Sequence, residues 1–217
     1  MKKYLSYSEM NLFWRDQAKW YKRYILGEQD EATDAMKLGK IIHKALEVPG
    51  FNWILEMRNM GASAKQRLAA RKILTQMNFP PESKPEQPLI ATDGDIKMFG
   101  IIDRYWPETR VMWEFKTTDR SSTWTQYRVD TNEQLSFYAY MLWQSRREYF
   151  SSMHLAVLNT KIGSTRVYTT VRSRADIVMI KEKVQKTVEK MKLLGLWNRR
   201  VSHKDTMMAK LYPQKLL

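Results

Sequence analysis

The chain has 217 residues, and its 37 lysines and arginines against 23 aspartates and glutamates give a net charge of +14 at neutral pH. Hydrophobic residues make up 43% and aromatic residues 12%, which is enough for a packed core and too much for a disordered basic tail. The absence of cysteine excludes disulfides, thiolate zinc sites, cysteine-bound iron–sulfur clusters and a cysteine nucleophile.

The length predicts a single domain over residues 1–217. No window approaches eighteen consecutive apolar residues, and the start MKKYLSYSEM lacks the apolar stretch of a secretory signal. We therefore expect no membrane association and a cytoplasmic location, which would be the host cytoplasm if a phage encodes the protein. A pI near 9.8 predicts a polyanionic partner, with RNA, DNA and anionic lipid all open.

The N-terminal region has a helical pattern. Apolar residues recur at three- and four-residue steps over 6–26, which predicts one helix. Ser6 and Glu9 fit a capping box at its start, and Gly27 is suited to its end.

Further helices are expected before the first strands. A second helix is predicted over 35–47, where Gly39 costs about 1 kcal/mol relative to alanine and so indicates a close approach by another segment. Residues 53–77 predict one or two more helices. The segment 80–88 contains four prolines and predicts a linker.

The period then changes to that of strands. Asp93-Gly94 predicts a hairpin turn within 89–106, and a second turn at 107–109 leads into a third strand over 111–117. Thr131 and Gln134 fit a capping box for the next helix. The later elements are expected as a helix over 131–147, strands over 153–159 and 165–171, and a basic helix over 173–194.

This order predicts an α/β fold in which helices flank a mixed central β-sheet. We divide the single domain into a helical part (1–80), a catalytic sheet with its helix (81–172), and a C-terminal helix with a basic tail (173–217).

The second hairpin brings charged side chains together. If it folds symmetrically, residues whose numbers sum to 217 face each other, so Asp103 lies opposite Glu114, and Lys116 shares the face of Glu114. Facing carboxylates repel unless a divalent cation lies between them, and oxygen ligands suit Mg²⁺ or Mn²⁺. The alternative is a surface strand pair whose lysine neutralises its acids.

Five segments together resemble the PD-(D/E)XK nuclease superfamily, and within it the RecB-like exonuclease group, which has a restriction-endonuclease-like core. These segments are SYSEMNLFWRDQAKWYKRYILG (6–27), GKIIHKALE (39–47), GIIDR (100–104), EFK (114–116) and QLSFY (134–138). Ile102 replaces the proline of the superfamily's name, as is usual in this group. The missing cysteines exclude the iron–sulfur cluster of related CRISPR-adaptation nucleases.

The resemblance implies roles for the charged cluster. Asp103, Glu114 and the carbonyl of Phe115 would bind a metal that neutralises the scissile phosphate and lowers the pKa of a bound water. Lys116 would orient that water or stabilise charge on the phosphate oxygens. His43 matches the metal-binding histidine of the group, although a lone histidine among apolar residues is otherwise a core residue.

The resemblance also makes Gln134 and Tyr138 supports of the active site, since they lie one helical turn apart. Gln134 is alternatively only the capping partner of Thr131, and Tyr138 only a core residue. Glu86 lies where relatives sometimes carry another acid, but we interpret it as a solvated loop residue.

Basic residues on the first helix and after the third strand are the candidates for DNA phosphate contact, whereas the aromatic residues among them are expected mostly in the core. The candidates are Arg15, Lys19, Lys22, Arg23, Arg120 and Arg128.

The sequence thus predicts a Mg²⁺- or Mn²⁺-dependent deoxyribonuclease, more specifically an exonuclease on single-stranded or frayed DNA in replication, recombination or repair. Two alternatives stay open. One is a non-catalytic nucleic-acid-binding protein on this scaffold, and the other is a nuclease subunit that is active only with a helicase or recombination partner.

Overall fold

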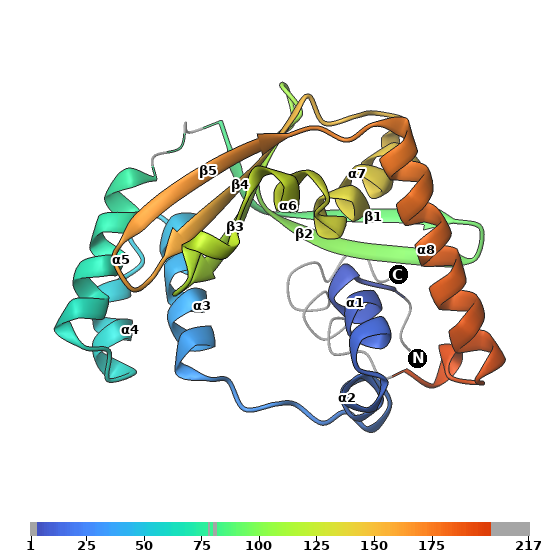
Figure 1. Cartoon of the computed structure of the whole chain (residues 1–217), viewed down its shortest axis with the longest axis horizontal. Coiled ribbons are helices and arrows are strands. Elements are labelled where there is room, and N and C mark those ends of the chain that lie inside the picture. The colour runs from blue at the N-terminus through green and yellow to red at the C-terminus, as the bar shows by residue number, and fades with distance from the viewer. Residues whose placement is uncertain (1–3, 78, 80–81, 201–217) are drawn as a thin grey trace.

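The fold is built on one mixed sheet, and the computed structural model describes residues 4–77, 79 and 82–200. The strand order is β1-β2-β3-β4-β5, in which only β3 and β4 are parallel neighbours (Figure 1). The strands are β1 (Lys84–Asp93), β2 (Ile96–Trp106), β3 (Val111–Thr118), β4 (Ser152–Asn159) and β5 (Ser164–Thr170). The expected α/β architecture with a mixed central sheet is confirmed.

Helices flank this sheet in two groups, which lie toward opposite ends of the view in Figure 1. The first group is α1 (Tyr7–Arg15), α2 (Gln17–Tyr21), α7 (Glu133–Arg146) and α8 (Arg174–Leu193). The second group is α3 (Asp34–Glu47), α4 (Trp53–Asn59) and α5 (Ala64–Gln76). A short helix α6 (Gln126–Asp130) precedes α7, and single turns occupy Lys22–Leu26, Ser121–Thr123 and Trp197–Arg199. None of the described helices is both long and apolar enough to cross a bilayer.

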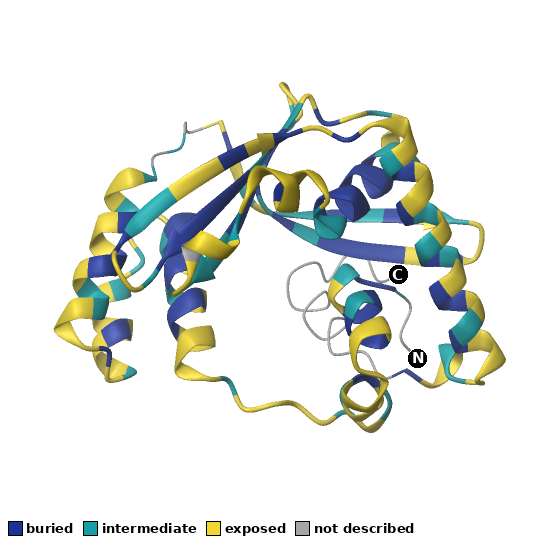
Figure 2. Cartoon of the chain, viewed as in Figure 1, coloured by how far each residue is buried: buried dark blue, intermediate teal, exposed yellow. Residues whose placement is uncertain are grey.

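Each group of helices encloses its own hydrophobic cluster against the sheet. Figure 2 colours the buried residues of these helices and strands dark blue. The first cluster joins α1, α7 and α8 to β1 and β2 through residues such as Phe13, Met98 and Phe137. The second joins α3 and α5 to β3 and β4 through residues such as Ile42 and Phe115. The region where β2 and β3 adjoin therefore lies between two separately packed cores.

The predicted single helix over 6–26 is wrong, because the helix is interrupted at Asp16. The backbone of Asp16 leaves the helical region at φ −157°, and its carboxylate accepts the backbone N–H of Lys19 at 2.9 Å, which starts α2. The last turn, Lys22–Leu26, is a π-helix that ends at Gly27 with φ +79°. Ser6 does cap α1, since its hydroxyl accepts the N–H of Glu9 at 3.3 Å.

Both hairpins form as predicted. The β2–β3 register pairs Arg104 with Trp113, and its pairs sum to 217, as the symmetric turn requires. The predicted linker over 80–88 is wrong from Lys84 onward, because β1 begins there. Pro85 and Pro88 are tolerated there because β1 is an edge strand, which pairs with a neighbour on one side only. Residues 80 and 81 lie outside the described part.

The predicted capping box at Thr131 is also wrong. Thr131 ends α6, and the side chain of Asn132 instead caps α7 by accepting the N–H of Leu135 at 3.2 Å. Gln134 is therefore free of a capping role. At the other end of the chain, the tail lysines 204, 210 and 215 lie outside the described residues.

Candidate metal-dependent active site

The candidate site begins where β2 and β3 stop pairing through their backbones. Their ladder joins 104–106 to 111–113, and beyond it the carboxylate of Asp103 accepts the backbone N–H of Phe115 at 2.6 Å. Two residues earlier on β2, the carbonyl of Ile101 accepts the hydroxyl of Tyr138 from α7 at 2.7 Å. Side chains thus take over as hydrogen-bond partners, and the strands separate enough for polar groups to enter from both sides.

Four of the predicted residues form one hydrogen-bonded network on the α7 side. Lys116 Nζ donates to Glu114 Oε1 at 2.7 Å and to Gln134 Oε1 at 2.8 Å. Gln134 Nε2 donates to Glu114 Oε1 at 2.7 Å and to the Tyr138 hydroxyl at 3.0 Å. Gln134 and Tyr138 therefore hold Glu114 and Lys116, as the resemblance implies.

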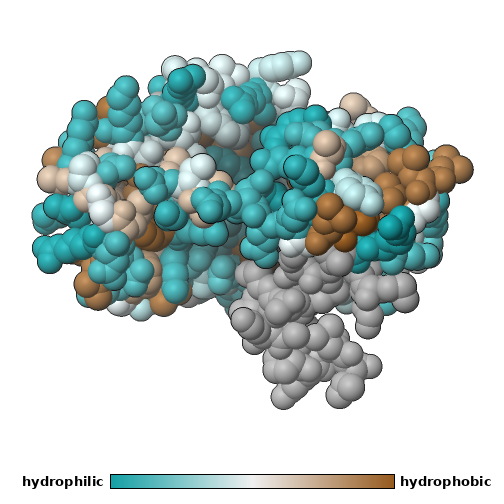
Figure 3. All heavy atoms as spheres, turned by 90° about the horizontal axis from the view of Figure 1, so that it is seen from below, coloured by the Kyte–Doolittle hydropathy of each residue, from teal (hydrophilic) through white to brown (hydrophobic). Residues whose placement is uncertain are grey.

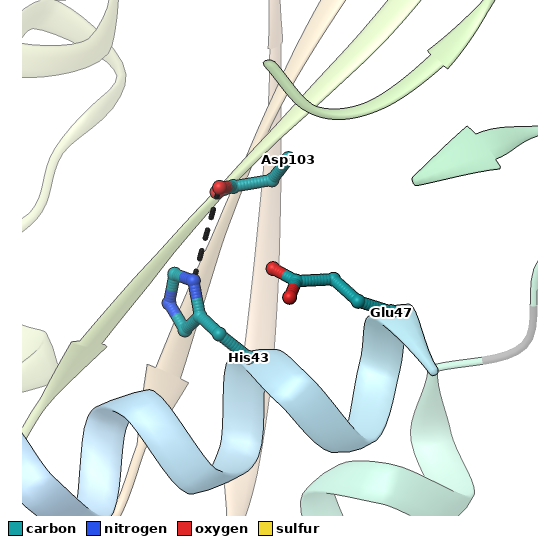
Figure 4. Close-up of side chains that lie close together, drawn as sticks. All are labelled: His43, Glu47 and Asp103. Carbon is teal, nitrogen blue, oxygen red and sulfur yellow. Dashed lines mark ion pairs between the residues drawn. The ribbon is translucent and has the colours of Figure 1, made fainter. Parts of the chain in front are cut away.

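Three potential metal ligands meet on the α3 side. His43 and Glu47, one helical turn apart on α3, both point toward Asp103 on β2 (Figure 4). His43 Nδ1 lies 3.8 Å from Asp103 Oδ1, and one ligand atom from each of the three residues lies within 4.8 Å of the others. The close approach predicted at Gly39 also exists, because a Cβ there would lie 2.6 Å from Thr117 Oγ1.

The residues present fit a divalent cation. Glu114 is 4% exposed, and its second carboxylate oxygen, Oε2, is buried without a hydrogen-bond partner among the described residues. A buried charged oxygen is unfavourable unless a cation or donor compensates it. Carboxylate oxygens with one imidazole form a donor set that suits Mg²⁺ or Mn²⁺.

The pKa shifts of the charged residues come from burial and from their neighbours' charges. Burial raises the pKa of Asp103 to about 6, although the Phe115 N–H and Lys116 oppose it. Burial and the charge of Asp103 raise the pKa of Glu114 to about 7. Burial lowers the pKa of His43, which favours the neutral imidazole that metals bind. Burial also acts to lower the pKa of Lys116, but Glu114 outweighs it and the net shift is upward, which keeps the amine charged.

A cleft of about 420 Å³ opens beside Lys116 on the side of α1. Its walls bring Arg15 and Arg23, two of the predicted phosphate contacts, to the same space as Gln134 and Tyr138. The molecule seen from below is covered largely by hydrophilic side chains, with smaller apolar patches (Figure 3).

The other predicted DNA contacts are more dispersed. Lys19 pairs with Asp30 at 3.2 Å, and Lys22 and Arg120 are exposed. Arg128 lies on α6 rather than on a loop, with its guanidinium 4.3 Å from the centre of the Trp124 ring. Of the aromatic residues nearby, Trp20 and Tyr24 are buried as expected, whereas Trp14 is 42% exposed.

Two acids near the site were not predicted as parts of it. Glu47 follows His43 by four residues, which places both side chains on one face of α3, and this spacing was the available signal. Glu86 lies on β1 with φ +45° rather than in a solvated loop, although it is exposed as expected. Burial raises the pKa of Glu47 and of Asp103, and the charge of Glu86 adds to both shifts. Of the remaining histidines, His154 packs on Trp113 with ring centres 4.6 Å apart, and His203 lies outside the described residues.

Comparisons with known proteins agree with this fold. A protein named "Putative exonuclease" from Eubacterium rectale has a crystal structure that aligns with a TM-score of 0.61 and 12% identity, over 92% of this chain and 83% of that one. The structure of SSO0001 aligns over 73% of this chain and 78% of that one at 15% identity, but its TM-score of 0.35 is too low to support an argument. Curated protein sequences give no match.

The family comparison covers the whole described region. The model of the PD-(D/E)XK nuclease superfamily matches residues 4–209, a range that contains every residue of the candidate site. The chain belongs to the PD-(D/E)XK nuclease superfamily.

Proposed function

We propose that this protein is a divalent-metal-dependent DNA nuclease that acts as an exonuclease on single-stranded or frayed DNA. The proposal rests on the buried Oε2 of Glu114, which has no hydrogen-bond partner in the described part of the chain. It lies beside Asp103 and a lysine that is already positioned. The net charge of +14 and the basic cleft beside Lys116 support a polyanionic substrate. A role in replication, recombination or repair stays a prediction.

In this proposal His43, Asp103, Glu114 and the Phe115 carbonyl hold Mg²⁺ or Mn²⁺, and Glu47 is an additional ligand. When bound, the ion supplies charge neutralisation at the scissile phosphate and lowers the pKa of a nearby water.

The protein's own groups do the positioning. The Phe115 N–H fixes one carboxylate oxygen of Asp103. The charged amine of Lys116, held by Glu114 and Gln134, stabilises negative charge that develops on the phosphate oxygens. Tyr138 holds Gln134 in turn, and its hydroxyl stays protonated because burial raises its pKa well above the usual value.

The test uses three variants that keep side-chain size: Asp103→Asn, Glu114→Gln and Lys116→Met. Each should reduce cleavage at least about 100-fold, the order of loss seen when one transition-state contact is removed. Single-stranded and duplex DNA, labelled at either end, are digested with Mg²⁺, Mn²⁺ or EDTA. Release of mononucleotides or short products from the end identifies an exonuclease.

The matched control is Glu108→Gln, which removes an exposed carboxylate from the β2–β3 turn and should leave cleavage unchanged. A wild-type protein that binds DNA but cuts none with any divalent metal would instead support the non-catalytic alternative. Activity that appears only after a helicase is added would support the subunit alternative.

A further inference from the structure

A second cleft of about 450 Å³ lies away from the candidate active site. It is enclosed by the end of α7, the first half of α8 and the turn between β1 and β2. Trp143, Tyr149, Arg147, Arg174 and Lys181 contribute to its walls. None of these residues takes part in the network around Glu114 and Lys116.

Two aromatic residues form one wall of this cleft. The ring centres of Trp143 and Tyr149 lie 5.0 Å apart with an angle of 35° between their planes. Tyr149 is 39% exposed, so part of its ring is open to a ligand. The guanidinium of Arg147 lies 5.4 Å from the centre of the Trp143 ring. Exposed aromatic rings with an adjacent arginine are suited to stacking of unpaired bases.

The cleft also carries a net positive charge. The guanidinium of Arg174 is exposed and makes no hydrogen bond or ion pair within residues 4–77, 79 and 82–200. Lys181 is 42% exposed, and its carboxylate partner, Asp93, is 3.9 Å away. Among the described residues that line the cleft, Asp93 is the one acid, against Arg147, Arg174 and Lys181. The accessible charges therefore favour an anion.

We propose that this cleft is a second binding site for an unpaired DNA strand, in which bases stack on Tyr149 and phosphates meet Arg174 and Lys181. The inference rests on the proposed function, since it assumes that the substrate is DNA. Stacking surfaces and cations together match a nucleotide chain better than either an apolar peptide or a free inorganic anion.

The two sites lie on one helix. Gln134 in the active-site network and Trp143 in the second cleft are nine residues apart on α7, which is about 14 Å along the axis and on opposite sides of the helix. A strand must therefore extend more than about four nucleotides beyond the active site to reach the cleft. The second site thus affects long substrates and leaves very short ones unaffected.

The test measures binding with metal chelated, so that cleavage does not interfere. A fluorescent single-stranded 20-mer is titrated with wild type, Arg174→Glu and Tyr149→Ala. We expect about tenfold weaker binding of the 20-mer by Arg174→Glu, and a smaller loss with Tyr149→Ala that disappears when the 20-mer lacks bases. With metal present, both variants should cleave a 4-mer, which is too short to span both sites, as fast as wild type.

The matched control is Arg71→Glu, which makes the same charge change at an exposed arginine on α5. If Arg71→Glu and Arg174→Glu weaken binding of the 20-mer equally, the effect comes from the overall charge of the protein, and the proposal is overturned. Displacement of the 20-mer by polyglutamate at the same concentration as by unlabelled DNA would also overturn it, in favour of an acidic peptide. A failure of the proposed function is distinguishable, because it appears as lack of cleavage of every substrate by wild type.

Discussion

At the scale of one residue, Glu114 has one carboxylate oxygen that is held by hydrogen bonds and one that is available to a cation. Its Oε1 accepts from both Lys116 and Gln134, whereas Oε2 is buried with no partner among the described residues. The side chain is therefore fixed in place before any cation arrives. Preorganisation of this kind reduces the reorganisation that ligand binding would otherwise require.

The raised pKa values predict an unusual pH dependence of stability without metal. In the folded chain the pKa is about 6 for Asp103, about 7 for Glu114 and about 8 for Glu47, all above those of an unfolded chain. The native state therefore binds more protons between about pH 4 and pH 8, so the free energy of unfolding falls as the pH rises through this window.

In EDTA, Tm should be several degrees lower at pH 8 than at pH 6, and Mn²⁺ should raise Tm more at pH 8, because the metal binds the deprotonated carboxylates. Thermal unfolding in both conditions measures this, and Glu114→Gln should show a flatter profile in EDTA. A Tm that increases from pH 6 to pH 8 without metal would contradict the assignment.

The role of α3 in metal binding is also testable at single residues. Loss of even an outer-shell partner of a metal ligand typically weakens binding 10- to 100-fold, and loss of a direct ligand weakens it at least as much. His43→Ala should therefore weaken Mn²⁺ binding at least about tenfold, measured by calorimetry, while the far-ultraviolet spectrum stays native. Glu47→Gln tests the added ligand in the same way. An unchanged titration for His43→Ala would identify His43 as a core residue.

At the scale of elements, α3 and β3 approach each other closely at Gly39, next to the candidate site. A Cβ at Gly39 would lie 2.6 Å from Thr117 Oγ1, and Thr117 directly follows Lys116. The helix that carries His43 can therefore lie this close to the strand that carries Lys116 because Gly39 has no side chain.

Gly39→Ala should accordingly destabilise the protein by about 1–3 kcal/mol through overpacking, although alanine is the better helix former. Thr117→Ala removes the clashing oxygen, so Gly39→Ala with Thr117→Ala should recover most of the loss. Urea unfolding of both single variants and the double variant gives the coupling free energy. Additive effects would show that the two residues do not share this contact.

At the scale of the whole molecule, the two ends of the described chain meet in a buried ion pair. Arg200 Nη1 lies 3.4 Å from Glu9 Oε1 on α1, and the two side chains are 1% and 0% exposed. The guanidinium also stacks on Trp197, with its carbon 3.5 Å from the ring centre. The segment after α8 therefore anchors α1, which forms a wall of the cleft beside Lys116.

Removing one partner of a buried ion pair costs about 3–5 kcal/mol, because the other charge stays buried. Arg200→Ala should lower Tm by roughly 10 °C for a chain of this length. The exposed neighbour provides the control, since Arg199→Ala should change stability by less than about 0.5 kcal/mol. Equal melting temperatures for the two variants would contradict this anchoring role.

The sequence by itself determined those features whose signals lie within a few residues of one another. Turn symmetry and side-chain alternation predict the register of the second hairpin. The Asp93-Gly94 signal predicted that the first hairpin exists but not its register, in which Asp93 pairs with Ile96. The same alternation brings Glu114 and Lys116 to one face. The superfamily motifs added His43, Gln134 and Tyr138 to the predicted site. Local patterns alone did not decide whether these three residues belong to the site or have only structural roles.

Only the tertiary structure decided the features that depend on distant segments. Pro85 enters a strand because β1 lies at the sheet edge. Glu47 joins the candidate site because the separation of β2 and β3 admits α3 to Asp103, and neither spacing nor composition encodes the distance between those segments.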